Sequence, residues 1–256
     1  MRIEPILLTT ARVQTYQGDA HLTNATAFFF ERGSRLFLVT SRHVVQDEAT
    51  GHHPDRIAID LHLGTEELAG VTGFSIPLFR DGLSVWREGS DQAGDVDVAM
   101  IEIDRRALPP DTLFRAFTPA HLAQDFDAIE VGSPLLVVGF PLGFHDSLHR
   151  LPIVRQAVIA SSFGLRFQGQ GYFLTDARTH RGTSGAPVVM RRPAEPGASA
   201  GLPWLLLGVH SARLDVGTRD QELDEALGLN CAWYADILMA LSADRPASAP
   251  ASIAKA

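Results

Sequence analysis

The sequence contains one cysteine, Cys231, and little that would favour binding to a membrane or to nucleic acid. A single cysteine excludes an internal disulfide and any cysteine-based zinc site. No run approaches the roughly 18 apolar residues of a membrane-spanning helix, and the apolar run near the N-terminus is too short for a secretory signal. Lys and Arg number 22 against 30 Asp and Glu, so the net charge of −8 disfavours contact with phosphate backbones. We therefore expect a cytoplasmic protein without nucleic-acid or membrane partners.

The sequence is rich in short apolar stretches separated by turn residues. Its 256 residues, 45% hydrophobic and 20% charged, are typical of a globular chain with one large domain or two small ones. Alternating or continuous Val, Ile, Leu and Phe predict strands. The predicted strands are 25–30, 35–40, 56–63, 96–103, 134–140, 153–161, 172–176, 187–190 and 204–210.

Helical patterns are scarce. They are confined to a short segment near 120–124 and to 234–242. Many closely spaced strands with few helices favour antiparallel barrels or sandwiches over a parallel βαβ sheet. The polar stretch 104–130 is expected to join two β halves, and 191–203 and 215–226 are expected to be surface loops. The last residues, 243–256, are rich in Ala, Pro and Ser and are predicted to be a disordered tail.

A serine lies between two glycines in the segment Arg181-Gly182-Thr183-Ser184-Gly185, directly before a β-branched strand. This pattern is typical of a tight turn that presents a hydroxyl group at the start of a strand. Glycine at 182 would let the N–H groups of residues 182 and 184 point toward one developing negative charge. Taken alone, the pattern is also that of a plain hairpin, and a serine nucleophile needs a base.

Two further positions suit such chemistry. His43 directly follows the predicted strand 35–40, although a polar strand cap would look the same. Asp95 and Asp97 lie on one face of the strand 96–103 and its approach, and periodicity does not choose between them. A carboxylate there could accept a hydrogen bond from an imidazole and fix its tautomer.

Together these segments resemble the trypsin-like (chymotrypsin-fold) serine peptidases, whose chain order is His, Asp, Ser. His43 lies in a stretch similar to Thr-Ala-x-His-Val, with Ser41 in place of the alanine. Asp97 matches the acid of the Asp-hydrophobic-Ala-hydrophobic-hydrophobic strand, and Ser184 matches the serine of Gly-x-Ser-Gly-Gly/Ala-Pro. The resemblance implies an all-β fold of two consecutive six-stranded antiparallel β-barrels with a short C-terminal helix. The expected division is 1–115, 116–242 and the tail.

Two other segments resemble those of bacterial heat-shock-type members. Phe173 to Ala177 is similar to their Thr-Asp-Ala segment, and Val138 to Gly143 is similar to their Gly-x-Pro-x-Gly. A PDZ-like domain downstream is not expected. Thr183 replaces the aspartate that pairs with a new N-terminus in digestive enzymes, so activation of that type is not expected either.

The resemblance implies that Ser184 attacks a peptide carbonyl while His43 accepts its proton and Asp97 orients the imidazole. The N–H groups of Gly182 and Ser184 would hold the oxyanion, and no metal or organic cofactor is required. The partner is a peptide or protein substrate.

Substrate preference is also suggested by the resemblance. Glutamyl endopeptidases have a Gly-hydrophobic-His segment like Gly208-Val209-His210 and a threonine five residues before the nucleophile, where Thr179 lies here. An imidazole and a hydroxyl can bind a carboxylate or an amide, and Arg178 would add charge. We therefore expect cleavage after Glu or Gln, against the alternative that His210 is an ordinary strand residue.

Two other functions compete with a serine endopeptidase. A catalytically idle peptidase-like barrel would bind a peptide or protein, although all three expected residues are present. An α/β-hydrolase esterase fits poorly, because its serine precedes the acid and the histidine along the chain.

Overall fold

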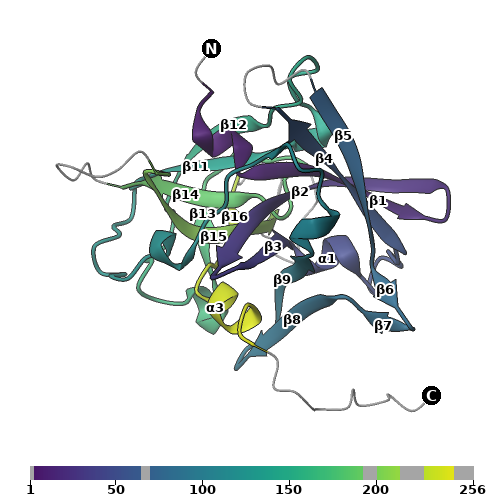
Figure 1. Ribbon diagram of the computed structural model, residues 1–256. Coiled ribbons are helices and arrows are strands. Elements are labelled where there is room, and N and C mark those ends of the chain that lie inside the picture. Colours follow the sequence, from purple (N-terminus) through teal and green to yellow (C-terminus); the bar gives the residue numbers. More distant parts are fainter. Residues whose placement is uncertain (1–2, 65–69, 193–200, 214–227, 245–256) are drawn as a thin grey trace.

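The computed structural model describes residues 3–64, 70–192, 201–213 and 228–244. Within these ranges the chain forms two large antiparallel sheets, which lie on opposite sides of the molecule in Figure 1, and one two-stranded sheet. The loop expected at 215–226 and most of the loop expected at 191–203 lie outside the described residues, as does the expected tail from residue 245 onward.

The first sheet is built from the N-terminal part of the chain. In the described part it has eight strands, and their order is β10-β4-β1-β2-β3-β9-β8, with β5 also paired to β4. The strands are β1 (Thr10–Gln17), β2 (Ala20–Arg32), β3 (Arg35–Thr40), β4 (Arg56–Leu63), β5 (Gly70–Pro77), β8 (Trp86–Asp91), β9 (Gly94–Ile103) and β10 (Thr112–Leu113). Six strands were expected here; the additional pairings are made by short or polar segments such as β8 and β10.

The second sheet is built from the C-terminal part. Its described strands number six, in the order β12-β11-β14-β15-β16-β13. They are β11 (Pro134–Gly139), β12 (Ile153–Val158), β13 (Tyr172–Thr175), β14 (Pro187–Arg191), β15 (Trp204–Arg213) and β16 (Asn230–Tyr234). A bridge between Ile159 and Thr175 joins the chain after β12 to the end of β13, so the two edges of this sheet approach each other.

Short elements connect the strands. A two-stranded hairpin comprises β6 (Phe79–Arg80) and β7 (Leu83–Ser84). The helices among the described residues are α1 (Arg42–Val45) and α3 (Ile237–Leu241), with 3-10 turns η1 (Pro5–Leu8), η2 (Arg105–Ala107), η3 (Pro119–His121), η4 (Pro141–Gly143) and η5 (Phe167–Gly169). The two helical segments expected from the sequence are therefore shorter than expected, and the first is a 3-10 turn.

Strand β2 shows why the apolar stretches are continuous rather than alternating. Phe28 and Phe30 point into a core between the two sheets, while Ala27 and Phe29 point into a second core within the first sheet. A strand buried on both faces has no polar side to show in its sequence. A third core, around Phe163 and other residues, fills the second sheet.

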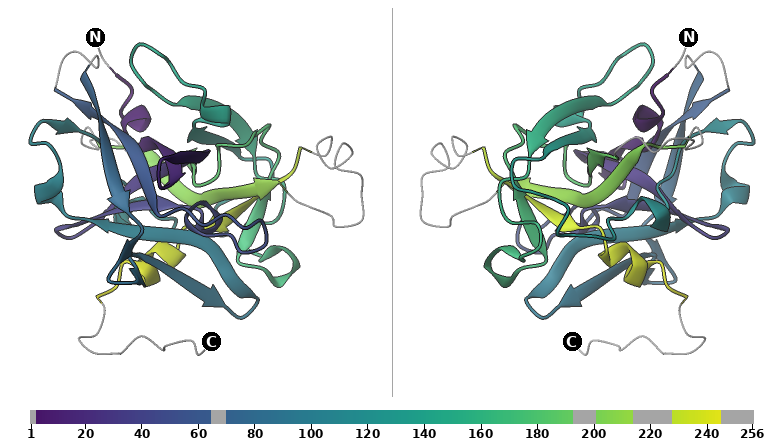
Figure 2. Two further views of the ribbon diagram at one scale, coloured as in Figure 1. Left: turned by 90° about the vertical axis from the view of Figure 1, so that its right-hand side faces the viewer. Right: turned by 90° about the vertical axis from the view of Figure 1, so that its left-hand side faces the viewer.

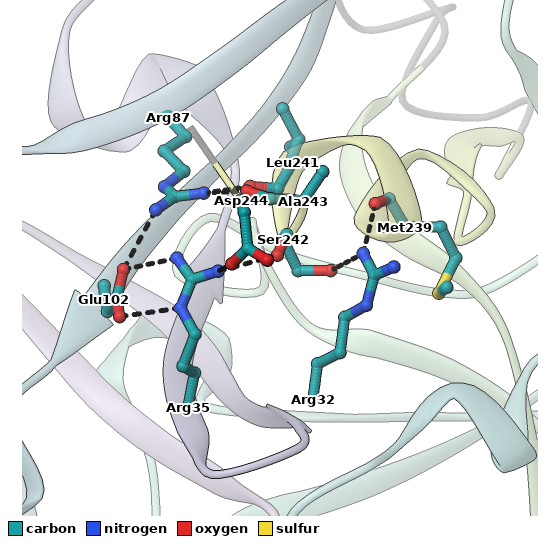
Figure 3. Close-up of polar contacts among 9 residues, drawn as sticks. All are labelled: Arg32, Arg35, Arg87, Glu102, Met239, Leu241, Ser242, Ala243 and Asp244. Carbon is teal, nitrogen blue, oxygen red and sulfur yellow. Dashed lines mark hydrogen bonds and ion pairs between the residues drawn. The ribbon is translucent and has the colours of Figure 1, made fainter. Parts of the chain in front are cut away.

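Helix α3 follows the second sheet but is held by the first (Figures 1 and 2). Three arginines of the first sheet donate hydrogen bonds to backbone carbonyls at the end of the helix, as Figure 3 shows. Arg32 reaches the carbonyl of Met239 at 2.8 Å, Arg35 that of Ser242 at 3.1 Å and Arg87 that of Leu241 at 3.0 Å. Since the last carbonyls of a helix lack internal partners and carry partial negative charge, cations stabilise them. The contact ties the two sheets together.

Candidate active site

The three residues expected to form a catalytic set come from three different elements. Asp97 is in β9 of the first sheet, His43 is on the one-turn helix α1 that follows β3, and Ser184 is in the turn before β14 of the second sheet. His43 therefore lies on a helix rather than on a strand end, because the chain turns at Ser41 and buries Val44 and Val45.

The Asp97 carboxylate receives three hydrogen bonds. Its Oδ2 atom lies 2.7 Å from Nδ1 of His43, and its Oδ1 atom accepts the backbone N–H of His43 at 2.8 Å. The hydroxyl of Ser211 also donates to Oδ2. Asp95 has no such role: its side chain is 72% exposed and its ion pair with Arg42 is long, at 3.8 Å. The half-buried Asp97 is thus held by donors on helix α1 and on strand β15.

The ionisation of His43 reflects these contacts. Burial lowers the pKa of the imidazole, whereas the hydrogen bond and charge of Asp97 raise it, with a further contribution from the charge of Asp47; the net pKa is above the ordinary value of 6.5. Because Nδ1 faces Asp97, the other ring nitrogen, Nε2, is left to act as a base whenever the imidazole is uncharged.

The turn that carries Ser184 is fixed by contacts with the first sheet. The carbonyl of Ser184 accepts the N–H of Thr26 at 2.9 Å, and the Thr26 hydroxyl donates to the carbonyl of Gly182 at 2.8 Å. Gly185 has φ +86°, and a side chain there would collide with Thr26 and Thr40. Glycine is therefore required at this contact between the turn and the first sheet.

Two backbone N–H groups beside Ser184 are the candidates for an oxyanion site. The Arg181 carbonyl accepts the N–H of Leu142 at 2.6 Å, so the trans peptide directs the N–H of Gly182 to the opposite side. Neither this N–H nor that of Ser184 donates to an acceptor in the part of the chain that the structure describes. Gly182 has φ +91°, and a Cβ atom at this position would lie 2.6 Å from the carbonyl oxygen of Phe140.

His43 and Ser184 line one cleft of about 590 Å³ between the sheets. Gly182, Leu142 and Asp47 also line it. No hydrogen bond joins the His43 ring to the Ser184 hydroxyl among the described residues, and Ser184 Oγ donates to no other group there. Such bonds are commonly long in the absence of substrate.

The residues expected to set specificity are only partly brought together. His210 on β15 and Thr179, in the connection between β13 and β14, are both buried, and the Thr179 hydroxyl donates to Oδ1 of Asn230 at 2.6 Å. Arg178 is exposed and forms no ion pair with a described residue. The next chain segment, 214–227, lies outside the described residues.

His210 is 2% exposed, and its Nδ1 atom has no hydrogen-bond partner in the described chain. Burial, followed by repulsion from His43, lowers the pKa of this imidazole to about 4. Its carbonyl accepts the Ser41 hydroxyl at 3.1 Å and the N–H of Gly185 at 2.7 Å. At neutral pH this side chain is therefore an uncharged hydrogen-bonding group.

Three residues of the site were not expected from the sequence. Ser211 supports Asp97, Thr26 supports the turn that carries Ser184, and Asp47 lies in the cleft with His43. Ser211 directly follows His210, and this position beside a candidate residue is the one feature of the sequence that could have pointed to Ser211. Thr26 contacts a residue 156 positions away, and no local pattern reports such a contact.

No metal centre is apparent among the described residues, where no group of three or more His, Cys, Asp or Glu side chains is arranged to hold an ion. His149 pairs with Asp146 at 2.6 Å, and Nδ1 of His145 lies 2.6 Å from the carbonyl oxygen of Gly143. No helix in the described ranges is long and apolar enough to span a membrane.

Comparison with known proteins gives one family and a set of similar folds. A family model described as the trypsin-like peptidase domain matches residues 25–192. The serine endoprotease from Yersinia pestis has a similar structure, with a TM-score of 0.51, 15% identity, and coverage of 94% of this chain and 65% of that one.

Rv3671c from M. tuberculosis H37Rv, solved in an inactive form, is also similar, with a TM-score of 0.46, 14% identity, and coverage of 92% of this chain and 85% of that one. The matched part of the Yersinia pestis chain is about two thirds of its length. A search of curated protein sequences found no match.

Proposed function

Because the chain belongs to the trypsin-like peptidase domain family, we propose that it is a serine endopeptidase that uses Ser184, His43 and Asp97. The observation that carries the proposal is the position of His43. Its Nδ1 atom lies 2.7 Å from Asp97, while its ring lines the cleft that contains Ser184. No cofactor takes part in the proposed reaction.

The proposed reaction begins when Nε2 of His43 takes the proton from the Ser184 hydroxyl and Ser184 Oγ attacks the peptide carbonyl. Asp97 stabilises the resulting imidazolium, which then protonates the leaving amine. Water, activated by the same imidazole, hydrolyses the acyl-enzyme and regenerates Ser184.

The tetrahedral intermediate carries its negative charge on the former carbonyl oxygen. The N–H groups of Gly182 and Ser184, which have no other acceptor among the described residues, are proposed to bind this oxygen. Donors held in position before the reaction contribute about 3–4 kcal/mol each in a comparable protease.

For specificity, we propose a pocket near His210 and Thr179 that takes a Glu or Gln side chain. The pKa of about 4 keeps His210 neutral at pH 7, so it can bond an uncharged amide but offers no charge to a carboxylate. We therefore expect Gln to be cleaved faster than Glu at pH 7, with the difference narrowing toward pH 5. Rates on matched peptides with Gln, Glu, Lys or Leu before the bond test this; a preference for Lys or Leu would contradict it.

The proposal extends to the architecture. We take the two sheets to be the two barrels of the family, with halves at 1–115 and 116–242, and the chain to be a bacterial member of the heat-shock-type or glutamyl-endopeptidase-like group. The bridge between Ile159 and Thr175, which draws the edges of the second sheet together, supports closure of the second barrel.

Labelling with a fluorophosphonate probe tests the activity. The wild-type chain should form a covalent adduct, and Ser184→Ala should not, although both should have the same circular dichroism spectrum. A folded wild-type chain that stays unlabelled where control proteases react would favour the other candidate, a peptide-binding barrel without activity.

A further inference from the structure

Three large apolar side chains project into solvent from the connection between β11 and β12. Leu142, Phe144 and Leu148 are 68%, 67% and 69% exposed. Single exposed apolar residues are common, and Val131 and Leu165, at 63% and 70%, are such residues in other connections. These three lie within seven positions of one connection, and we call them the apolar ridge; apolar side chains exposed together on one loop are candidates for a binding surface.

The connection that carries the ridge has a defined conformation. Asp146 organises its tip: Oδ1 accepts the N–H of Leu148 at 2.9 Å, Oδ2 lies 2.6 Å from Nδ1 of His149, and the backbone carbonyl accepts the N–H of Arg150 at 2.7 Å. Leu142 and Arg150 have left-handed backbones, with φ of 55° and 57°. Bulky residues adopt this conformation only at a cost, so the surrounding contacts must impose it.

The same connection is anchored to the first sheet at two places. The ring of His62, which is buried on β4, bonds the carbonyl of His149 at 2.7 Å. Gly143 lies against Asn24 of β2, so closely that a Cβ atom there would approach the Asn24 side chain to 3.2 Å. The ridge is therefore held in a fixed position relative to His43, which belongs to the first sheet.

The ridge begins at the catalytic cleft. Leu142 lines the cleft together with His43 and Ser184, and its N–H fixes the Arg181 carbonyl beside the proposed oxyanion site. His210 and Thr179, the groups proposed to bind the side chain before the scissile bond, do not line this cleft. The cleft and the ridge that continues from it thus lie where the leaving part of the substrate would be.

We propose that the apolar ridge binds the segment of a polypeptide substrate that follows the scissile bond, and that it prefers apolar side chains there. The inference rests on the proposed peptidase function and adds a substrate class to it. An extended segment leaving the cleft past Leu142 would bury its apolar side chains against Phe144 and Leu148, which removes apolar surface of both partners from water.

The test compares Phe144→Ser/Leu148→Ser with the matched control Val131→Ser/Leu165→Ser. Three substrates share one sequence before the scissile bond: a nitroanilide with no residue after it, a peptide continuing in Leu and Phe, and a peptide continuing in Ser and Asn. We expect the ridge variant to lose about tenfold in kcat/KM on the Leu/Phe peptide, mainly through KM, and to stay within about twofold on the others. The control should resemble wild type throughout.

Several results would overturn the proposal. They are equal kcat/KM of wild type on the Leu/Phe and Ser/Asn peptides, an equal loss on the nitroanilide, or an equal loss in the control variant. Sedimentation of the wild type and the ridge variant gives one more such result. A dimer that forms in the wild type but not in the ridge variant would show that a second copy of this chain, not a substrate, covers the ridge.

If no substrate is hydrolysed, a binding measurement can still test the role proposed for the ridge. Fluorescence anisotropy of the same two peptides with Ser184→Ala should show tighter binding of the Leu/Phe peptide, reduced by the Phe144→Ser/Leu148→Ser pair. If the protein binds the Leu/Phe peptide more tightly but hydrolyses no substrate, the peptidase function is contradicted and the role of the ridge is not. Equal binding of the two peptides would contradict the ridge.

Discussion

Replacing Thr26 with valine should destabilise the protein and slow the reaction of Ser184. The Thr26 side chain is fully buried, and its hydroxyl joins the first sheet to the turn that carries Ser184. It donates to the carbonyl of Gly182 at 2.8 Å and accepts the N–H of Phe140 at 3.0 Å. Valine keeps the shape but leaves both backbone groups buried without partners.

The size of the effect follows from these two bonds. Each buried polar group left unpaired costs about 1–3 kcal/mol, so Thr26→Val should lower the free energy of unfolding by about 2–6 kcal/mol. Thr26→Ser keeps the hydroxyl and removes one methyl group, which costs about 1 kcal/mol. Because Gly182 supplies a proposed oxyanion donor, the valine variant should also label with a fluorophosphonate roughly tenfold more slowly or worse.

Urea unfolding followed by tryptophan fluorescence measures the first effect, and the labelling rate without urea measures the second. The serine variant should retain most of both properties. If valine and serine at position 26 gave the same free energy of unfolding and the same labelling rate, the role assigned to the Thr26 hydroxyl would be refuted.

Two further predictions concern charge and backbone geometry. Asp47→Asn removes a negative charge that helps raise the pKa of His43, so the acid limb of the kcat/KM profile should move to lower pH. Glu48→Gln removes a neighbouring exposed charge and should leave the acid limb in place. Identical pH profiles for the two variants would contradict the effect assigned to Asp47. Gly185→Ala combines positive φ with a collision against Thr26 and Thr40 and should lower the free energy of unfolding by about 2–6 kcal/mol. Gly18→Ala has positive φ but open space around the added methyl, so chemical denaturation should show a loss of only about 1 kcal/mol, and equal losses at the two positions would exclude the steric argument.

The apolar stretches of the sequence predicted strands that the structure contains, because burial on one or both faces leaves a local pattern. The predicted stretch 56–63, for example, is β4 without a change of boundary. Strands such as β1 (Thr10–Gln17) and β8 (Trp86–Asp91) were not predicted, since both contain several polar or charged residues and β8 lies at the edge of its sheet. Edge strands bury less surface and carry a weaker signal.

The residues of the candidate site likewise include some that the sequence predicted and some that it did not. Ser184 and His43 were found from local motifs and the family resemblance, whereas Thr26 and Asp47 act through contacts that exist only after folding. The charge state of His210 also depends on burial, which lowers its pKa to about 4. The sequence identifies His210 as a candidate residue but does not show that its side chain is buried.

The central claim is that His43 and Asp97 make the hydroxyl of Ser184 nucleophilic. Its most direct test is the second-order rate of fluorophosphonate labelling at Ser184, located by mass spectrometry of the modified peptide, in wild type and in His43→Ala. We predict one adduct per chain on Ser184 in wild type and a labelling rate at least about a thousandfold lower in the folded histidine variant. Labelling at an equal rate in both proteins, or at a residue other than 184, would contradict the claim.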